Sequence, residues 1–192
     1  MQSSGSATLN LSSLLQHSPG APLDVGGEGL FTPAHELLEA DGLRLKGPLK
    51  WRLTVINAGG DDDFVLEGSV EGTVVMECRR CLIDVDTPVK TSFVYPMAYR
   101  PSDLPLMLDE DGEEGDDELL VFGDPQVDFS AFLTELVAIE LPITALCRPD
   151  CLGLSEEGVN LNEHPELAPQ PKHVKQVDES PFAALKDIDI SA

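Results

Sequence analysis

The sequence of 192 residues predicts an α+β fold, in which an antiparallel β-sheet (barrel-like or strongly twisted) is covered by one or two helices. Between residues 43 and 98, apolar and polar residues alternate with period two over long stretches, which is typical of strands with one buried face. From Asp128 to Pro142, apolar residues instead recur at helical spacing. Such a helix can cover the apolar face of the sheet, which must be shielded from water.

Composition divides the chain into three parts. We expect a flexible N-terminus over residues 1–8, a single α+β domain over residues 9–154 with an acidic loop at 101–118, and an acidic, proline-containing tail over residues 155–192. The segment from Ser18 to Gly29 is rich in Gly and Pro and is expected to be a loop. Before it lies a short apolar patch that can dock on the core, formed by Leu9, Leu11, Leu14 and Leu15.

Three long strands are expected in the middle of the chain. The first runs from Leu43 to Val55, with a break at Gly47-Pro48, and carries apolar residues at odd positions. In the second strand, Gly68 and Gly72 indicate a bend or a bulge. The third strand covers Thr87 to Ala98. The residues of the second and third strands that should face the core are Phe64, Leu66, Val70, Val74, Met76, Val89, Phe93, Tyr95 and Met97.

Two helical segments accompany these strands. Thr32 can cap a short helical turn with Pro33 at its first position, where the missing N–H of proline is not needed. Asp128 is a suitable N-cap for a longer helix, which Pro142 ends. The apolar face of this longer helix consists of Phe129, Phe132, Leu133, Leu136, Val137 and Ile139.

The charge is distributed unevenly along the chain. Residues 1–43 sum to −5, residues 44–100 are neutral and residues 101–192 sum to −18, which gives the net charge of −23. This charge argues against tight, sequence-independent binding of nucleic acid and against an anionic membrane surface as partner. A surface that binds anions must therefore lie mainly in the middle third of the chain. The run from Asp109 to Glu118 has eight acidic residues in ten, and is either a solubilising loop or a site that binds a basic partner or mimics nucleic acid.

The sequence shows no targeting or membrane-spanning segment. The first basic residue is Arg44, and no apolar run approaches the roughly 18 residues of a transmembrane helix. We therefore expect a cytoplasmic protein without a membrane partner. Thiols stay reduced in that compartment, so its cysteines suggest a metal site or thiols before disulfides.

The four cysteines form two closely spaced pairs. Cys78 and Cys81 make a C-x2-C motif, and Cys147 and Cys151 make a C-x3-C motif. Two such pairs on turns can supply four sulfurs at about 2.3 Å from one metal ion, so we expect a structural zinc site. Neighbouring arginines would favour the deprotonated thiols that such a site needs. The alternative is a group of unmetallated thiols, or one or two disulfides, packed together.

A second group of candidate residues is basic. Four of them share one face of the first strand, and two lie inside the C-x2-C motif. They could form a patch that binds phosphates, as nucleic acids present, or they could pair with Glu67, Glu71 and Glu77 on the same polar face. Trp51 lies on the opposite, apolar face and is expected in the core. The candidate phosphate-binding residues are Arg44, Lys46, Lys50, Arg52, Arg79 and Arg80.

The sequence contains no recognisable enzymatic motif. It has no Gly-rich phosphate loop, no Gly-x-Ser-x-Gly and no His-Glu-x-x-His, and its four histidines lie far apart in expected loops or tails. We therefore expect no catalytic residues and no small-molecule substrate.

The order of the motifs along the chain is distinctive. A β-rich stretch ends in Cys78-Arg79-Arg80-Cys81, and an acidic insertion and a helix lead to Cys147-x3-Cys151-Leu152-Gly153-Leu154. Over roughly residues 9–160 this order resembles the bacterial YceD family, the large ribosomal RNA subunit accumulation proteins, which has relatives in plant plastids. Many members continue with a further Cys-x-x-Cys-Gly, where this chain has Ser155-Glu156-Glu157-Gly158. The departure leaves a single set of four cysteines.

The resemblance implies a non-enzymatic role in making or keeping large-subunit ribosomal RNA, which in bacteria is 23S rRNA, with that RNA or its precursor as partner. The residues leave two classes of function open. In the first, an assembly factor contacts the RNA through its basic residues. In the second, an acidic adaptor or escort holds a basic ribosomal protein or an RNA-processing enzyme and does not touch RNA itself.

Overall fold

The computed structural model describes residues 5–16, 21, 23–40, 42–59, 63–103, 105–109 and 119–168. The chain divides into two compact units, each described by itself below. The first unit comprises residues 1–79 and 83–147, and the second comprises residues 80–82 and 148–192. All the strands and α-helices of the described residues lie in the first unit, whereas the described part of the second unit contains one short 3-10 helix, η1 (Pro165–Leu167).

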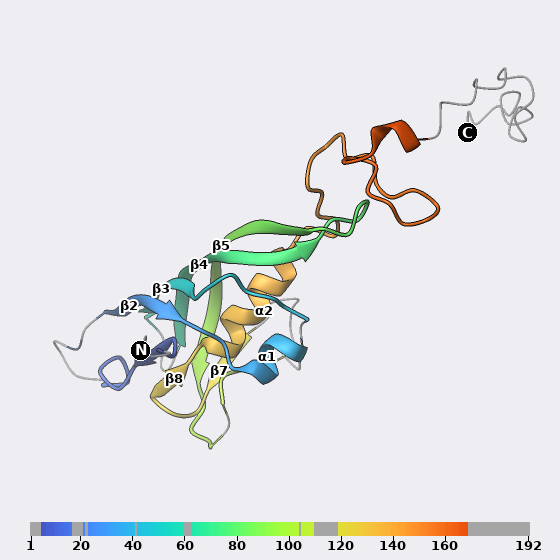
Figure 1. Cartoon of the computed structure of the whole chain (residues 1–192). Helices are drawn as coiled ribbons and strands as arrows, with labels where there is room; N and C mark the ends of the chain where they lie inside the picture. Colours follow the sequence, from blue (N-terminus) through green and yellow to red (C-terminus); the bar gives the residue numbers. More distant parts are fainter. Residues whose placement is uncertain are drawn as a thin grey trace, which may run out of the picture. The chain divides into compact units, whose positions relative to one another are not determined.

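The elements of the first unit form a six-stranded sheet, a two-stranded sheet and two helices (Figure 1). In chain order they are β1 (Thr8–Asn10), β2 (Asp24–Phe31), α1 (His35–Ala40), β3 (Leu49–Asn57), β4 (Asp63–Glu77), β5 (Asp84–Tyr99), β6 (Met107–Asp109), β7 (Leu119–Phe122), β8 (Gln126–Asp128) and α2 (Ser130–Glu140). The larger sheet has the order β2-β3-β4-β5-β7-β6, and β1 pairs with β8.

The predicted sheet is confirmed in its centre and corrected at its edges. Strands β2, β3, β4 and β5 pair antiparallel with one another in chain order, as expected for long strands that follow each other in sequence. Strand β7, however, runs parallel to β5, so the sheet is mixed. Among the described strands, β2 and β6 form the two edges and do not pair with each other. The barrel-like alternative is therefore wrong, because a closed barrel requires paired edges.

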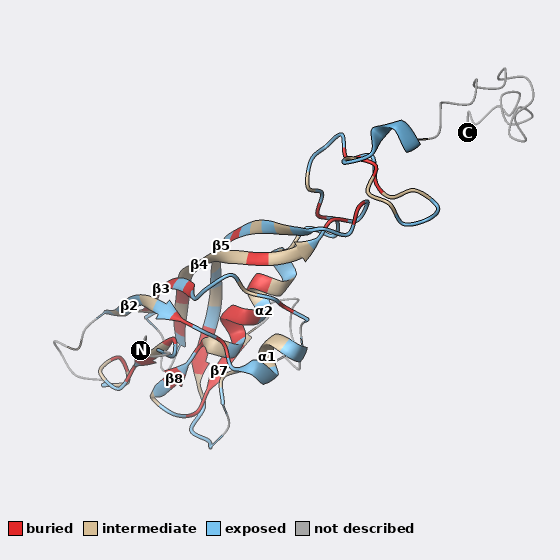
Figure 2. Ribbon diagram, in the orientation of Figure 1, coloured by how far each residue is buried: buried red, intermediate tan, exposed pale blue. Residues whose placement is uncertain are grey.

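The period-two pattern buries one face of the sheet against α2. On β3, the alternate residues Leu49, Leu53 and Val55 are fully buried. Helix α2 packs on β4 and β5, and the ring of Phe132 meets those of Phe93 and Tyr95 edge to face at centroid distances of 5.5 and 5.2 Å. Figure 2 shows this buried band on the sheet and on the covering helix. Edge-to-face ring pairs add to the apolar area that such a contact removes from water.

The structure differs from two predictions about the strands, and both differences occur at glycines. The segment from Ser18 to Gly29, expected to be a loop, includes most of β2, in which Gly27 and Gly29 lie against the indole ring of Trp51 on β3. A Cβ at Gly29 would lie 3.3 Å from Trp51 Nε1, so glycine there gives the large ring its room. Gly68 and Gly72 produce no bulge, because β4 pairs with β3 and β5 in unbroken register. They admit Leu53 and Leu49 instead, whose Cδ2 atoms would lie 2.5 and 2.4 Å from an added Cβ.

Both helices occur near their predicted positions. The short helix after Pro33 is α1, and the longer one ends before Pro142 as expected. The N-cap residue of α2 is Phe129 and not Asp128, although the Asp128 carboxylate still accepts a hydrogen bond of 2.9 Å from the Ser130 N–H. Ile139 was expected on the buried face, but its side chain is 80% exposed.

The N-terminal segment packs on the core of the first unit. The apolar patch at the N-terminus docks as predicted, with Leu9, Leu11 and Leu14 buried. The expected flexible N-terminus includes Ala7, which is fully buried, and Thr8, the first residue of β1. Most of the acidic run from Asp109 to Glu118, and the tail beyond residue 168, lie outside the described residues. Among the described helices, none is long and apolar enough to cross a membrane.

Candidate metal centre and charged sheet face

The first pair of cysteines lies on the tight connection between β4 and β5. Cys78 follows the last residue of β4, and its N–H donates a hydrogen bond of 2.8 Å to the carbonyl of Ile83. Cys78 also forms an isolated parallel bridge with Ala145, whose carbonyl accepts the Arg79 N–H at 3.0 Å. Leu82 has a φ of 62°, which is rare for a residue with a side chain. The backbone is thus folded back sharply on both sides of Cys81.

The four cysteine sulfurs gather as the sequence predicts. Their Sγ atoms all lie within 4.8 Å of one another. A tetrahedral metal site with bonds of about 2.3 Å needs sulfurs about 3.8 Å apart, so a small contraction closes this set around one ion. Three of the cysteines are buried, and Cys147 is half-buried. The arrangement is compatible with a metal site made of four thiolates.

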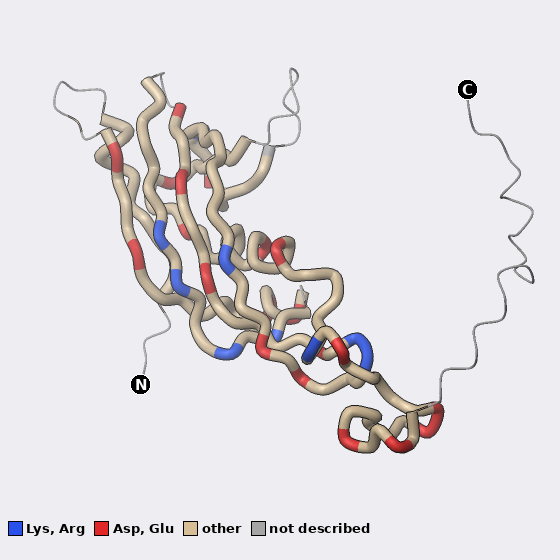
Figure 3. The backbone as a smooth tube through the Cα atoms, turned by 90° about the horizontal axis from the view of Figure 1, so that it is seen from above, with Lys and Arg blue, Asp and Glu red and all other residues tan. Residues whose placement is uncertain are grey.

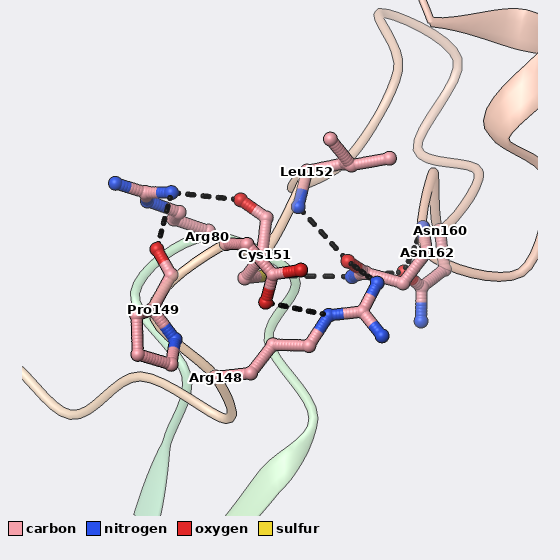
Figure 4. A network of polar contacts seen from close by, with 8 residues as sticks. Arg80, Arg148, Pro149, Cys151, Leu152, Asn160 and Asn162 are labelled. Atoms are coloured by element: carbon pink, nitrogen blue, oxygen red, sulfur yellow. Dashed lines mark hydrogen bonds and ion pairs between the residues drawn. The ribbon is translucent and has the colours of Figure 1, made fainter.

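Hydrogen bonds around Cys151 support the charged form of its sulfur (Figure 4). The Asn162 side-chain amide donates to Cys151 Sγ at 3.2 Å, and its oxygen accepts the Leu152 N–H at 2.9 Å and Arg148 Nη2 at 2.6 Å. Arg80 Nη1 donates to the Cys151 carbonyl at 2.8 Å. A hydrogen bond donated to the sulfur, such as that from Asn162, stabilises a thiolate more than a thiol. The donor set therefore fits a metal that prefers sulfur, such as zinc.

Asn162 is a contributor that sequence reasoning missed. It lies eleven residues after Cys151 in a stretch expected to belong to the tail. A Cys-rich motif indicates ligands, but it does not indicate which distant amide will orient them. The only available signal was the pair Asn160 and Asn162, whose side chains hydrogen-bond to each other at 2.8 Å.

The segment from Ser155 to Gly158 forms a turn that hydrogen bonds hold in place without a further pair of cysteines. The Ser155 hydroxyl accepts hydrogen bonds of 3.2 Å from the N–H groups of Glu157 and Val159. Gly158 has a φ of 81°, which allows the turn to close on the Ser155 carbonyl at 3.0 Å. A hydroxyl and a glycine thus hold this turn, and a single set of four cysteines remains.

The six candidate RNA-binding residues differ in their local contacts. Four of them lie on the polar side of the sheet unit, in exposed ion pairs. Arg80 instead donates to the carbonyls of Pro149 and Cys151. Arg79 is exposed beside Cys78. Figure 3 shows basic and acidic residues at neighbouring positions of adjacent strands.

The ion pairs connect adjacent strands and segments. Arg44 meets Asp84 at 2.8 Å, Lys46 meets Asp86, and Arg52 meets Glu28 at 2.7 Å. Lys50 meets Glu71 at 3.0 Å, and Lys90, which the sequence analysis did not single out, meets the same carboxylate at 3.4 Å. Glu71 is the one predicted acidic partner that appears in these pairs.

These pairs change the acidity of two carboxylates. Hydrogen bonds from Lys50, then from Lys90, hold the pKa of Glu71 below its usual value. The hydrogen bond from Arg44 likewise lowers the pKa of Asp84 and raises that of Arg44. Both carboxylates are therefore charged at neutral pH. Trp51 lies on the other side of the sheet, 6% exposed, and is a core residue as predicted.

Comparison with known proteins identifies a family model and several relatives that match this chain. A family model described as large ribosomal RNA subunit accumulation protein YceD matches residues 66–189. An uncharacterized protein of Mycobacterium tuberculosis is 35% identical over 105 residues, which cover 54% of this chain and 48% of that protein. An uncharacterized protein of Mycobacterium leprae is 31% identical over 96 residues, covering 50% of this chain and 42% of the relative.

A plant relative aligns over more of the chain. The large ribosomal RNA subunit accumulation protein YCED homolog 1, chloroplastic, of Zea mays is 24% identical over 178 residues, covering 81% of this chain and 55% of that protein. The chain spans about half the length of the curated relatives it matches. No solved structure matches it significantly.

Proposed function

This chain belongs to the YceD family of large ribosomal RNA subunit accumulation proteins, and from that premise we propose that it is a non-enzymatic factor promoting the accumulation, processing or assembly of large-subunit ribosomal RNA. The plant relative carries the same description in its name. The observation that carries the proposal is the family match over residues 66–189, which includes both cysteine pairs. In a bacterial cell the RNA would be 23S rRNA or its precursor, in the cytoplasm.

The direct contact with RNA would use basic residues of the sheet unit. Arg44, Lys46, Lys50 and Arg52 are exposed, and each can exchange a carboxylate partner for a phosphate group at modest cost, because exposed ion pairs are weak. Against a net charge of −23 such binding depends strongly on salt. The proposed contact therefore involves only a short stretch of RNA, bound at the polar face of the sheet.

The four cysteines would hold a structural zinc ion. Zinc bound by four thiolates has no open position for a substrate, so it would supply fold stability and no chemical step. Cys78, Cys81, Cys147 and Cys151 would be the ligands, and Asn162 would orient Cys151 through its hydrogen bond.

A second candidate function is an acidic adaptor or escort for a basic ribosomal protein or an RNA-processing enzyme. Two observations favour it. The basic residues of the sheet are already paired with carboxylates, and residues 101–192 carry a net charge of −18. In this case the protein promotes RNA accumulation without touching RNA.

A native pull-down of the tagged protein at low salt, with and without nuclease, separates the two candidates. Retention of large-subunit precursor RNA, with ribosomal proteins released by nuclease, supports direct RNA contact. A single basic protein that stays bound after nuclease supports the escort. If neither large-subunit RNA nor a ribosomal or RNA-processing protein is retained, the proposed function is wrong.

The variants for this experiment should spare the cysteine cluster. Reversal of Arg80 would remove its hydrogen bonds to the Pro149 and Cys151 carbonyls and would confuse loss of RNA with loss of structure. Arg44→Glu combined with Lys46→Glu changes only exposed pairs of the sheet unit. RNA retention that survives this double reversal unchanged, at several salt concentrations, would argue for the escort.

A further inference from the structure

A small pocket on the polar face of the sheet concentrates positive charge. It has a volume of about 130 Å³ and is open to solvent between β3, β4 and β5. Three of its lining residues are cations, and one is a carboxylate. The residues that line it are Lys50, Trp51, Arg52, Ser69, Glu71 and Lys90.

Strand register places these side chains in two rows. In the first row, Lys50 and Lys90 lie opposite Glu71 from either side. In the second row, Arg52 lies opposite Ser69. Residues two apart on a strand point to the same face about 7 Å apart, so both rows share the polar face. Arg52 thus lies opposite Ser69, and Lys50 and Lys90 lie diagonally across from Ser69 on the neighbouring strands.

Carboxylates neutralise this pocket only in part. Glu71 serves both lysines, at 3.0 Å from Lys50 and 3.4 Å from Lys90. Arg52 pairs with Glu28 on β2 at 2.7 Å. These three cations share two paired carboxylates, and Glu67 lies two residues from Ser69 on the same polar face. By contrast, Arg44 and Lys46 on the same polar side are each matched to an aspartate of their own.

We propose that this pocket is a phosphate-binding site and that its occupant is a backbone phosphate group of RNA. Lysine, arginine and serine side chains are donors, and a phosphate offers several acceptor oxygens to them. Glu71 holds the two lysines over the pocket and competes with the phosphate for them. The inference rests on the proposed RNA contact and narrows it to Lys50, Arg52, Ser69 and Lys90, of which Ser69 and Lys90 are new.

The sharpest test is a substitution that should improve binding. In Glu71→Gln the two lysines lose their competing carboxylate, so we expect a severalfold tighter complex with a short single-stranded RNA of mixed sequence. Glu67→Gln makes the same charge change four residues away on β4 and serves as the matched control. If Glu71→Gln binds this RNA no more tightly than Glu67→Gln does, Glu71 does not compete with the phosphate for the lysines, and the proposal is wrong.

The opposite change should weaken binding. We expect Lys50→Gln combined with Lys90→Gln to bind the same RNA roughly tenfold less tightly, with the slope of log affinity against log salt reduced by about 1.4. Arg44→Gln combined with Lys46→Gln removes the same charge outside the pocket and should cost clearly less. Equal losses in the two double variants would show a general charge effect and overturn the site. All four positions are exposed, and a thermal melt checks that each variant is folded.

Two further outcomes separate this site from the broader proposal. If the wild type binds RNA but none of the pocket variants changes that binding, the site is wrong and the RNA contact stands. If the wild type binds no RNA at any salt concentration, both the phosphate site and the proposed RNA contact are wrong.

Amide shifts of Lys50, Ser69 and Lys90 in NMR identify the source of the phosphate. Shifts with inorganic phosphate but none with RNA would overturn RNA as the occupant.

Discussion

The two units of this protein are stabilised in different ways. The sheet unit buries a large apolar core, with Phe31, Phe122 and Phe129 among its fully buried side chains. In the described part of the second unit, Leu161 and Cys151 are buried and the rest consists mainly of turns and hydrogen bonds. Segments this short rarely bury enough surface to fold without a disulfide or a metal. The comparison teaches that the cysteine cluster matters most where the apolar core is smallest.

If the cysteine cluster holds zinc, as proposed, loss of the metal should produce the largest difference between the units. Because structural zinc sites supply most of the folding free energy of small metal-bound segments, Cys151→Ser or chelation should unfold residues 148–168, at a cost of several kcal/mol. Amide hydrogen exchange should show lost protection there, with protection retained in β3 and β4. Metal analysis of the wild type provides the control. Purified native protein with no bound metal and four titratable thiols would contradict the zinc site.

Substitution in the core should weaken the sheet unit instead. Phe132 on α2 is 7% exposed and contacts the rings of Phe93 and Tyr95. Phe132→Ala should therefore lower the free energy of unfolding by about 3–5 kcal/mol, measured by denaturant titration. Ile139→Ala on the same helix is the matched control, because its side chain is 80% exposed and should change stability by less than about 0.5 kcal/mol. Similar costs at both positions would mean that α2 does not cover the sheet as described.

This contrast also explains which parts could be predicted from the sequence. The long strands and α2 can be predicted from the sequence because burial imposes a repeating pattern on many residues at once. Strand β2 was not, because its glycines suit a loop until the Trp51 ring of β3 is placed against them. Its strand state is a tertiary effect, and no local propensity reports it. The same reason hides the purpose of Gly68 and Gly72, which depends on Leu53 and Leu49.

The candidate sites follow the same division. The cysteine set was predictable because ligand type and short spacing are local properties that together require a shared centre. Asn162 and Lys90 were missed because their roles depend on which residues lie beside them in space. Lys90 joins the basic residues only through the register of β5 with β4.

A smaller effect should follow from changing the environment of Cys151. In Asn162→Asp the oxygen acceptors remain, but the amide donor to Cys151 Sγ is replaced by a negative charge. A change of this kind around a metal ligand weakens metal affinity by about 10- to 100-fold. Competition with a chromogenic chelator measures this loss. Glu156→Ala, an exposed position in the same unit, should leave metal affinity unchanged. An unchanged affinity in Asn162→Asp would show that the hydrogen bond does not support the metal.

The smallest expected effect is electrostatic and belongs to the sheet unit. The pKa of Asp84 is lowered in the folded protein by the hydrogen bond from Arg44. A carboxylate with a lowered pKa stabilises the fold at pH values above its unfolded pKa of about 4, and this stabilisation is lost as pH falls through the folded pKa. Wild-type protein should therefore melt slightly above Asp84→Asn at pH 7, and the two curves should converge toward pH 2.

A double-mutant cycle with Arg44→Met isolates this pair from other changes in charge. Because both side chains are exposed, the coupling between them should be small and should shrink in high salt. A coupling that is large, or that grows as pH falls, would contradict this account. It would mean that the polar face of the sheet contributes to stability in the way that the buried face does, and that its cations are less available to a phosphate than the pocket requires.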